Sequence, residues 1–264
     1  LTHDMARFFA YRWGEDGLGG ISDNHQRLCF ALALWNGKDP ILKERLFGLA
    51  NPEGNHGEDV KECYCHLDNT PPHAFMRFLY RYPQAHFPYD LLLTQNGQRD
   101  RTEPEFEIED TGVFDDKRYF DIEIAYAKAD ADDLCIRIRA VNRGPEPADL
   151  RLVPTLWFRN VWRFSRDEPR PSIWPLEPGL IVSDHQELGL YYLAFEGGPD
   201  VLFTENESNN MRLYAARNRS HYVKDAFHRH IVEEEANAIT HEGGTKSGLH
   251  YRFTLGPGEE TVLR

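Results

Sequence analysis

The segment Phe120-Asp-Ile-Glu-Ile-Ala-Tyr126 decides the fold class of this 264-residue chain. Aromatic and aliphatic side chains stand at every second position, with charged or small residues between them. Successive side chains on a strand point to opposite faces, so this pattern predicts a strand with one buried face. Leu134-Cys-Ile-Arg-Ile138 repeats the alternation, and the two segments together predict a hairpin.

The same kind of pattern continues after this hairpin. Asn142-Arg-Gly-Pro145 is a strong turn signal, and short apolar runs follow it, separated by turns rich in Gly, Pro and Asn. These runs cover residues 150–156, 180–182, 188–195, 201–203, 211–216 and 249–255. Many short strands without helices alternating between them predict an antiparallel β-sandwich rather than a parallel α/β fold.

The first 110 residues show a mixed pattern. Asp39-Pro40 and Thr70-Pro71 each have the form of a helix start, in which a capping side chain is followed by proline. They predict two short helices, over residues 40–47 and 73–80. Long irregular stretches lie around and between these two segments.

We therefore expect a mainly β chain with a few short helices in its first third. Residues 1–264 are predicted to form one domain, loop-rich and partly helical over 1–110 and built of sandwich strands over 111–264. The chain begins at Leu1 rather than at a methionine and stops at Arg264, shortly after a turn. These ends predict a region excised from a longer protein.

The charge and composition argue against several classes of partner. Thirty Lys and Arg against 43 Asp and Glu give a net charge of −13, which disfavours binding to a nucleic-acid backbone. The same charge suits binding of neutral ligands such as sugars, or reflects solubility alone. No stretch approaches the roughly 18 consecutive apolar residues of a membrane span. We expect neither a nucleic acid nor a membrane as partner.

The four cysteines are spaced irregularly and form no CxxC pair. So few cysteines in a chain of this length indicate reduced thiols and a cytoplasmic location. Cys63-Tyr-Cys65-His66 lacks the further ligands of a structural zinc site. The sequence also has no phosphate-binding loop and no dinucleotide fingerprint, so we expect neither a metal nor a cofactor.

The segment Asn51–Glu62 is the most polar and glycine-punctuated loop of the chain. It places five ionisable side chains close together, His56, Glu58, Asp59, Lys61 and Glu62. Glycines allow tight turns that crowd such side chains. A cluster of this kind can hydrogen-bond sugar hydroxyls, orient a neighbouring loop, or form an ordinary solvated surface, and the sequence leaves these alternatives open.

A second group of carboxylates lies over residues 105–110 and at Asp115 and Asp116. Glycoside hydrolysis uses two carboxylates that face each other across the scissile bond. The alternation of Glu with apolar residues over 105–109 is, however, typical of the solvated face of a strand. We assign no catalytic residue here.

The segment Trp157-Phe-Arg-Asn-Val-Trp162 mixes aromatic and polar side chains. Its first two rings suit the core of a sandwich. The choice between core packing and sugar contact stays open for Arg159, Asn160 and Trp162. These three residues are candidates for contact with sugar hydroxyls and sugar faces. The segment His228-Arg-His230 would place two imidazoles on one strand face as a pair of ligands, although a surface pair explains the spacing as well.

Four long segments resemble bacterial glucosidase-like proteins related to glycoside hydrolase family 63, the family of mannosyl-oligosaccharide glucosidase. The first is Glu15-Asp-Gly-Leu-Gly-Gly-Ile-Ser-Asp-Asn-His-Gln-Arg-Leu-Cys-Phe-Ala-Leu-Ala-Leu-Trp-Asn-Gly37. Residues 39–62, which include Asn55-His-Gly-Glu-Asp-Val-Lys-Glu62, are similar in the same way. Asp110-Thr-Gly-Val-Phe-Asp-Asp116 and Val153-Pro-Thr-Leu-Trp-Phe-Arg-Asn160 extend the resemblance over nearly the whole chain.

The resemblance implies an antiparallel β-super-sandwich like that of galactose mutarotase, followed in the parent protein by a catalytic (α/α)6 barrel. The general acid and base of an inverting hydrolase would lie on that barrel, so no catalytic residue is carried onto this chain. The implied partners are the barrel and an oligosaccharide or glycoside substrate. The loop 55–62 and the segment around Asp115 are expected to face the barrel, and part of the aromatic stretch Phe75–Phe87 is expected to form an apolar docking surface.

The implied function is that of a non-catalytic N-terminal domain of an α-glucosidase-like hydrolase, which stabilises the barrel and shapes its active-site entrance. One alternative is a stand-alone sugar mutarotase or epimerase, in which His185 or His228 pairs with Glu233 or Glu235. Another alternative is a carbohydrate-binding module that presents an exposed row of Trp and Tyr side chains.

Overall fold

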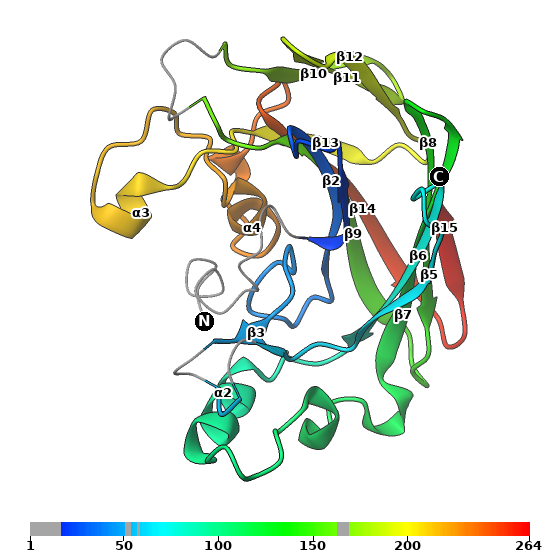
Figure 1. The fold of residues 1–264 in the computed structure, drawn as a ribbon, viewed down its shortest axis with the longest axis vertical. Coiled ribbons are helices and arrows are strands. Elements are labelled where there is room, and N and C mark those ends of the chain that lie inside the picture. Colours follow the sequence, from blue (N-terminus) through cyan, green and yellow to red (C-terminus); the bar gives the residue numbers. More distant parts are fainter. Residues whose placement is uncertain (1–16, 51–53, 57–58, 163–168) are drawn as a thin grey trace. The chain divides into compact units, whose positions relative to one another are not determined.

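The computed structural model describes residues 17–50, 54–56, 59–162 and 169–264. This part of the chain is mainly β, with antiparallel sheets and a few short helices (Figure 1). The predicted mainly β fold class is confirmed. Within the same residues, no helix has both the length and the apolar character needed to cross a membrane.

The chain divides into two compact units that are interleaved in the sequence. Unit 1 contains the described residues up to Gly19 together with Trp35–Arg151 and Arg252–Arg264. Unit 2 contains Gly20–Leu34 and Leu152–Tyr251. The chain therefore passes from one unit to the other several times, and neither unit is a single continuous segment.

Unit 1 is built on a five-stranded sheet with the strand order β15-β8-β7-β6-β5. These strands are β5 (Tyr64–Asn69), β6 (Phe75–Pro83), β7 (Tyr119–Asp130), β8 (Asp133–Asn142) and β15 (Glu260–Leu263). A separate pair joins β3 (Gly48–Leu49) to β4 (Asp59–Val60). The predicted hairpin is the pair β7–β8, in which Ile122 lies opposite Ala140 and Ile124 lies opposite Ile138. All four of these side chains are buried, as the alternation predicts.

Unit 2 contributes most residues of a second five-stranded sheet, with the order β1-β2-β9-β14-β13, and all of a three-stranded sheet, β10-β11-β12. The first sheet has β1 (Leu18–Ser22), β2 (Leu28–Trp35), β9 (Ala148–Phe158), β13 (Asp200–Thr204) and β14 (Lys246–Leu255). The second has β10 (Ser172–Glu177), β11 (Leu180–His185) and β12 (Gly189–Ala194). A buried cluster of Cys29, Ala31 and Trp157 confirms that Trp157 is a core residue.

The helices are short. They are α2 (Tyr89–Gln98), α3 (Asn210–Tyr214) and α4 (Ala226–Ile231), with single 3₁₀ turns η1 (Ile108–Thr111), η2 (Asp115–Lys117) and η3 (Ala236–Ala238). The prediction of a strand over residues 211–216 is wrong, because α3 occupies this segment. The Asn209 side chain accepts a hydrogen bond from the Arg212 amide and so caps the helix.

The two helices predicted in the first third are also wrong. Residues 73–80 enter strand β6, which pairs with β7 from Phe75 to Pro83. Thr70, taken as a helix cap, closes a turn instead, since its side chain accepts a hydrogen bond from the Phe75 amide at 3.0 Å. Residues 40–47 form no regular helix. In both segments, pairing and buried contacts override the local signal.

The expected docking surface over Phe75–Phe87 is overturned by the burial of its rings. Phe78 is 6% exposed, and Tyr80, Tyr82 and Phe87 are completely buried inside unit 1. Phe87 belongs to a core cluster that also includes Phe47, Tyr89 and Leu92. These rings therefore form the interior of unit 1 rather than a surface.

A charged network lies at the centre of unit 1. The side chains of Lys43 and Glu62 are fully buried, and the Lys43 ammonium lies 2.7 Å from Glu62 Oε1. The ammonium also donates to the Tyr89 hydroxyl at 2.6 Å. Glu62 accepts two further hydrogen bonds, from the Tyr80 hydroxyl at 2.6 Å and the Phe47 amide at 2.9 Å. Each buried charge thus has several partners, as a dry environment requires.

Asp39 extends this network. Its carboxylate accepts hydrogen bonds from the Tyr82 hydroxyl at 2.9 Å, the Tyr89 hydroxyl at 3.1 Å and the Ile41 amide at 3.0 Å. Burial raises the pKa of both Asp39 and Glu62, and the Lys43 charge opposes that rise. One cation therefore serves two buried carboxyl groups and ties together segments that are distant in sequence.

We expect the Lys43→Met variant to lose ~3–5 kcal/mol of unfolding free energy, because it leaves Glu62 buried without its counter-charge. Urea denaturation followed by circular dichroism measures this loss. Lys128→Met is the matched control, since Lys128 is exposed on β7 and its loss should change stability by less than ~0.5 kcal/mol. Equal stability of the Lys43 variant and the control would contradict the role given to the network.

The network tyrosines predict a sharp loss of stability at alkaline pH. Burial raises the pKa of Tyr80, Tyr82 and Tyr89 well above the ordinary value. Unfolded tyrosines ionise near pH 10, so the folded state retains protons that the unfolded state releases. Stability is fully present below about pH 10 and falls as the pH rises above it.

Tyrosinate absorbance and circular dichroism, recorded together against pH, test this expectation. The three tyrosines should ionise only as the sheet signal disappears, whereas in urea all 12 tyrosines of the chain should titrate near pH 10. Complete ionisation near pH 10 with the sheet signal intact would show that the hydroxyls are not buried as described.

Candidate functional site

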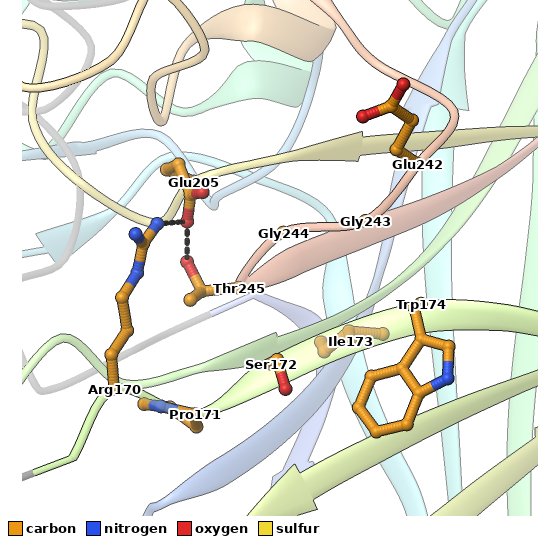
Figure 2. Close-up of a pocket in the computed structure, with 10 residues that line it drawn as sticks. All are labelled: Arg170, Pro171, Ser172, Ile173, Trp174, Glu205, Glu242, Gly243, Gly244 and Thr245. Carbon is orange, nitrogen blue, oxygen red and sulfur yellow. Dashed lines mark hydrogen bonds and ion pairs between the residues drawn. The ribbon is translucent and has the colours of Figure 1, made fainter.

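A cavity of about 410 Å³ lies within unit 2, where β10 meets the segment that leads into β14 (Figure 2). Its lining combines an aromatic ring, charged side chains and a glycine-rich backbone. The lining residues are Arg170, Pro171, Ser172, Ile173, Trp174, Glu205, Glu242, Gly243, Gly244 and Thr245. This volume suits a small polar molecule rather than a macromolecule.

Two glycines bring the walls of the cavity together. The backbones of Ile173 and Gly244 exchange hydrogen bonds of 2.7 and 2.8 Å, which attaches β10 to the segment before β14. A Cβ atom at Gly244 would overlap the Thr204 carbonyl oxygen. A Cβ atom at Gly243, which has a φ of +150°, would lie 2.8 Å from the Ile173 carbonyl oxygen. Only glycine therefore permits this close approach of the backbones.

Glu205 is the central polar group of the cavity. Arg170 forms an ion pair with its carboxylate, and the Thr245 hydroxyl donates to the same carboxylate at 2.8 Å. Figure 2 shows both side chains converging on Glu205, while Glu242 lies further along the Gly243–Gly244 segment. The Thr245 hydroxyl also accepts from the Asn206 amide at 2.8 Å, so its orientation is fixed.

Trp174 belongs to an aromatic face of the three-stranded sheet. Trp174, Val182 and Tyr192 are directly opposite one another across β10, β11 and β12, so their side chains share one face. Tyr192 is 56% exposed, and the nearby Leu190 on β12 is 52% exposed. Unit 2 thus presents an apolar, partly aromatic surface beside a polar cavity.

The polar groups and the indole offer complementary chemistry. Carboxylate and guanidinium groups hydrogen-bond hydroxyls, and an indole face packs on apolar C–H surfaces. In the cavity the positive charge of Arg170 is already matched by Glu205, and Glu242 adds a second carboxylate. This combination favours a neutral, polyhydroxylated ligand over a phosphorylated one.

The predicted residues of the 157–162 segment support the cavity from behind. Asn160 donates to the Asn206 carbonyl at 2.9 Å, and the Trp162 indole donates to Glu207 at 3.1 Å. Both bonds hold the segment that carries Glu205. For Trp162 the sequence left core packing and sugar contact open, and its 6% exposure places it in the interior. Arg159 is exposed and contacts Gln26 at 3.2 Å.

The predicted polar loop forms a separate cluster in unit 1. The Lys61 side chain is buried, and its ammonium contacts Asp59 at 2.5 Å, Glu107 at 2.9 Å and also Glu105. His56 Nδ1 lies 2.9 Å from Glu105. The loop thus orients the neighbouring 105–107 segment, which was one of the alternatives that the sequence left open. Glu58 lies outside the described residues.

The carboxylates of Asp59, Glu105 and Glu107 all contact the Lys61 ammonium. Burial disfavours the charge of Lys61, but hydrogen bonds to the carboxylates outweigh this effect and raise its pKa. Burial raises the pKa of Asp59, and the hydrogen bond from Asp59 lowers the pKa of Glu105. The Lys61 ammonium supplies the positive charge that these carboxylates need, and the cluster is therefore structural.

The remaining predicted residues lie apart from both clusters. Asp115 and Asp116 are exposed in η2, and Asp116 has a left-handed backbone with a φ of 57°. Residues 105–109 are not a strand, contrary to expectation, because η1 begins at Ile108. The histidines of the 228–230 segment lie on helix α4 rather than on a strand, and His228 Nε2 is 3.2 Å from Glu233 Oε1.

Sequence reasoning missed the cavity residues, in particular Arg170, Trp174, Glu205 and Thr245. It treated Glu242-Gly-Gly244 and the start of the 205–210 segment only as turns between strands. A pair of adjacent glycines flanked by a carboxylate and a threonine was the available signal, since such glycines often mark a close backbone approach.

Comparisons with known proteins show a similarity to a yeast protein. A comparison with protein-family profiles finds no matching family. The chain is 40% identical, over 302 aligned residues, to a protein of Saccharomyces cerevisiae (strain ATCC 204508 / S288c) that is described as "Uncharacterized protein YMR196W". The alignment includes the whole of this chain but only 28% of the yeast protein. The similarity therefore extends to a much longer protein.

We expect the Gly244→Ala variant to be destabilised by ~1–3 kcal/mol, because the added methyl group overlaps the Thr204 carbonyl and must push the end of β13 away. Thermal and urea unfolding measure the change. Gly256→Ala is the matched control, since its added methyl meets only the flexible Glu259 side chain at 3.2 Å. A Gly244 variant as stable as the control would show that the cavity walls are not held this closely.

Proposed function

We propose that this chain is a non-catalytic, carbohydrate-contacting domain of a larger α-glucosidase-like glycoside hydrolase. In this proposal it packs against a catalytic (α/α)6 barrel of the same parent chain and shapes the entrance to its active site. The reaction is inverting hydrolysis of a glycoside or oligosaccharide, and the catalytic carboxylates lie outside this chain. A cytoplasmic location belongs to the same proposal.

The observation that carries the proposal is the cavity around Glu205 with the aromatic face beside it. Sugars present hydroxyls at their edges and C–H groups on their faces, and unit 2 offers partners for both. Arg170, Glu205 and Glu242 supply charged hydrogen-bonding groups, while Trp174 and Tyr192 supply rings on one sheet face. A row of this kind is the feature expected of the alternative, a carbohydrate-binding module, and the proposal assigns that binding role to the accessory domain.

The length of the yeast protein supports the larger parent chain. This chain spans 28% of that protein, which leaves room for a further domain of several hundred residues. The Lys61 cluster is compatible with a loop that faces such a domain, because its internal ion pairs hold His56 and Asp59 in fixed positions.

A specific contact favours the mutarotase or epimerase as a second candidate. His228 and Glu233 form a close pair, which is the acid–base combination that sugar ring opening uses. Neither residue, however, is among those that line the cavity. The proposal therefore ranks this activity below an accessory role.

Binding of maltose and longer α-glucans to the chain tests the proposal. We expect the Trp174→Ala variant to bind about 10-fold more weakly, which corresponds to about 1.4 kcal/mol, because the ligand loses the indole face. Titration calorimetry measures the affinity. Tyr214→Ala is the matched control, since Tyr214 is 63% exposed on α3 and does not line the cavity.

Two outcomes would count against the proposal. Unchanged affinity in the Trp174 variant would remove the cavity from consideration as the sugar site. Polarimetry of fresh α-glucose provides the second test, since mutarotation that is accelerated by the chain and lost in His228→Gln would favour the alternative enzyme.

A further inference from the structure

Three side chains of unit 2 lie close together and have no part in the proposed function. They are Asp200 at the start of β13, His230 in α4 and His250 in β14. One ligand atom from each residue lies within 4.8 Å of the others. Two imidazoles and one carboxylate are a donor set that divalent transition metals bind well.

The sheet register explains why two of these residues meet. Asp200 and His250 are directly opposite each other in the antiparallel pair β13–β14, so their side chains project from the same face of the sheet. His250 is 5% exposed, which places its imidazole in a buried environment. The pairing of two strand residues, rather than flexible loops, therefore defines the position of two donors.

Helix α4 brings the third residue to the same face. Gly248, two positions before His250, shares its face of β14, and a Cβ atom there would lie 2.8 Å from the Phe227 ring and 2.9 Å from Val153. The absence of a side chain at Gly248 thus allows Phe227 and its helix to pack directly on the strand. His230 follows Phe227 on α4 and reaches the Asp200–His250 pair.

A backbone contact orients the ring of His230. His230 Nδ1 lies 3.4 Å from the Glu235 carbonyl oxygen, which only accepts hydrogen bonds, so Nδ1 is the donor in this contact and Nε2 is the nitrogen available to bind an ion. Such a bond to a carbonyl is the usual support of a metal-binding histidine. His241 donates from Nδ1 to the Val201 carbonyl at 2.9 Å and lies 3.9 Å from Asp200 Oδ1, beside the cluster rather than in it.

We propose that Asp200, His230 and His250 bind a divalent transition-metal ion of the zinc class. Tetrahedral zinc with bonds of about 2.0–2.2 Å separates its ligand atoms by about 3.4 Å, which small side-chain rotations reach from the present arrangement. Three protein ligands leave one coordination position for water or for an oxygen of an external ligand. The ion ties α4 to β13 and β14 and so stabilises this part of unit 2.

Titration of the metal-free chain with Co²⁺ tests the proposal, because cobalt substitutes for zinc and reports its ligands by visible absorption. We expect one ion per chain, with the weak bands of nitrogen and oxygen ligands, and competition by Zn²⁺. Asp200→Asn and His250→Gln should each weaken binding at least about 100-fold, since removing a ligand costs more than disturbing its support. Zn²⁺ should raise the unfolding temperature of the unaltered chain but not that of these two variants.

The matched control is His241→Gln, whose exposed side chain neighbours the cluster but already donates to a backbone carbonyl. This variant should bind cobalt as the unaltered chain does. Circular dichroism of every variant in chelator checks that it folds. Intense thiolate charge-transfer absorption would assign the metal to the free cysteines and overturn the proposal. Binding that survives in folded Asp200→Asn, or no binding up to millimolar cobalt, would overturn it as well.

Discussion

The buried ammonium of Lys43 is the constraint on which the arrangement of unit 1 depends. A charge in a dry interior needs partners, and here Glu62 and Tyr89 of α2 contact the ammonium. Tyrosines of β6 in turn hydrogen-bond the carboxylates of residues 62 and 39. Tyr80 and Tyr82 reach the network from alternate positions of β6, so a one-residue slip of that strand would withdraw both hydroxyls. The network thus selects one register, and β6 transmits it to β7 and β8.

The arrangement of unit 2 depends instead on glycines, which have no side chains and let backbones and neighbouring rings come close. Gly244 lets the backbone before β14 touch Thr204 and Ile173, and Gly248 lets Phe227 rest on the same strand. The first contact shapes the cavity around Glu205, and the second positions α4 over the Asp200–His250 pair. Two glycines, one just before β14 and one on it, therefore organise two groups of polar side chains. These glycines are not the residues that carry the chemistry.

The sequence predicted what local periodicity encodes. The alternation over 120–126 fixed β7 and its partner β8, because burial of one sheet face is a local signal. The helix starts at Asp39 and Thr70 failed, since the same side chains serve a buried network and a turn instead. Glu205, Arg170 and Thr245 could not be grouped from the sequence, because a long-range approach of backbones brings them together.

The strand order of unit 1 has a consequence for synthesis of the chain. Arg139 on β8 and Glu260 on β15 form an ion pair across 121 positions of sequence, and all of the residues between Leu152 and Tyr251 belong to unit 2. While a ribosome produces these residues, the outer edge of β8 lacks its neighbour and exposes unpaired backbone groups. During translation, this edge is therefore open to chaperone binding or to mispairing with another chain.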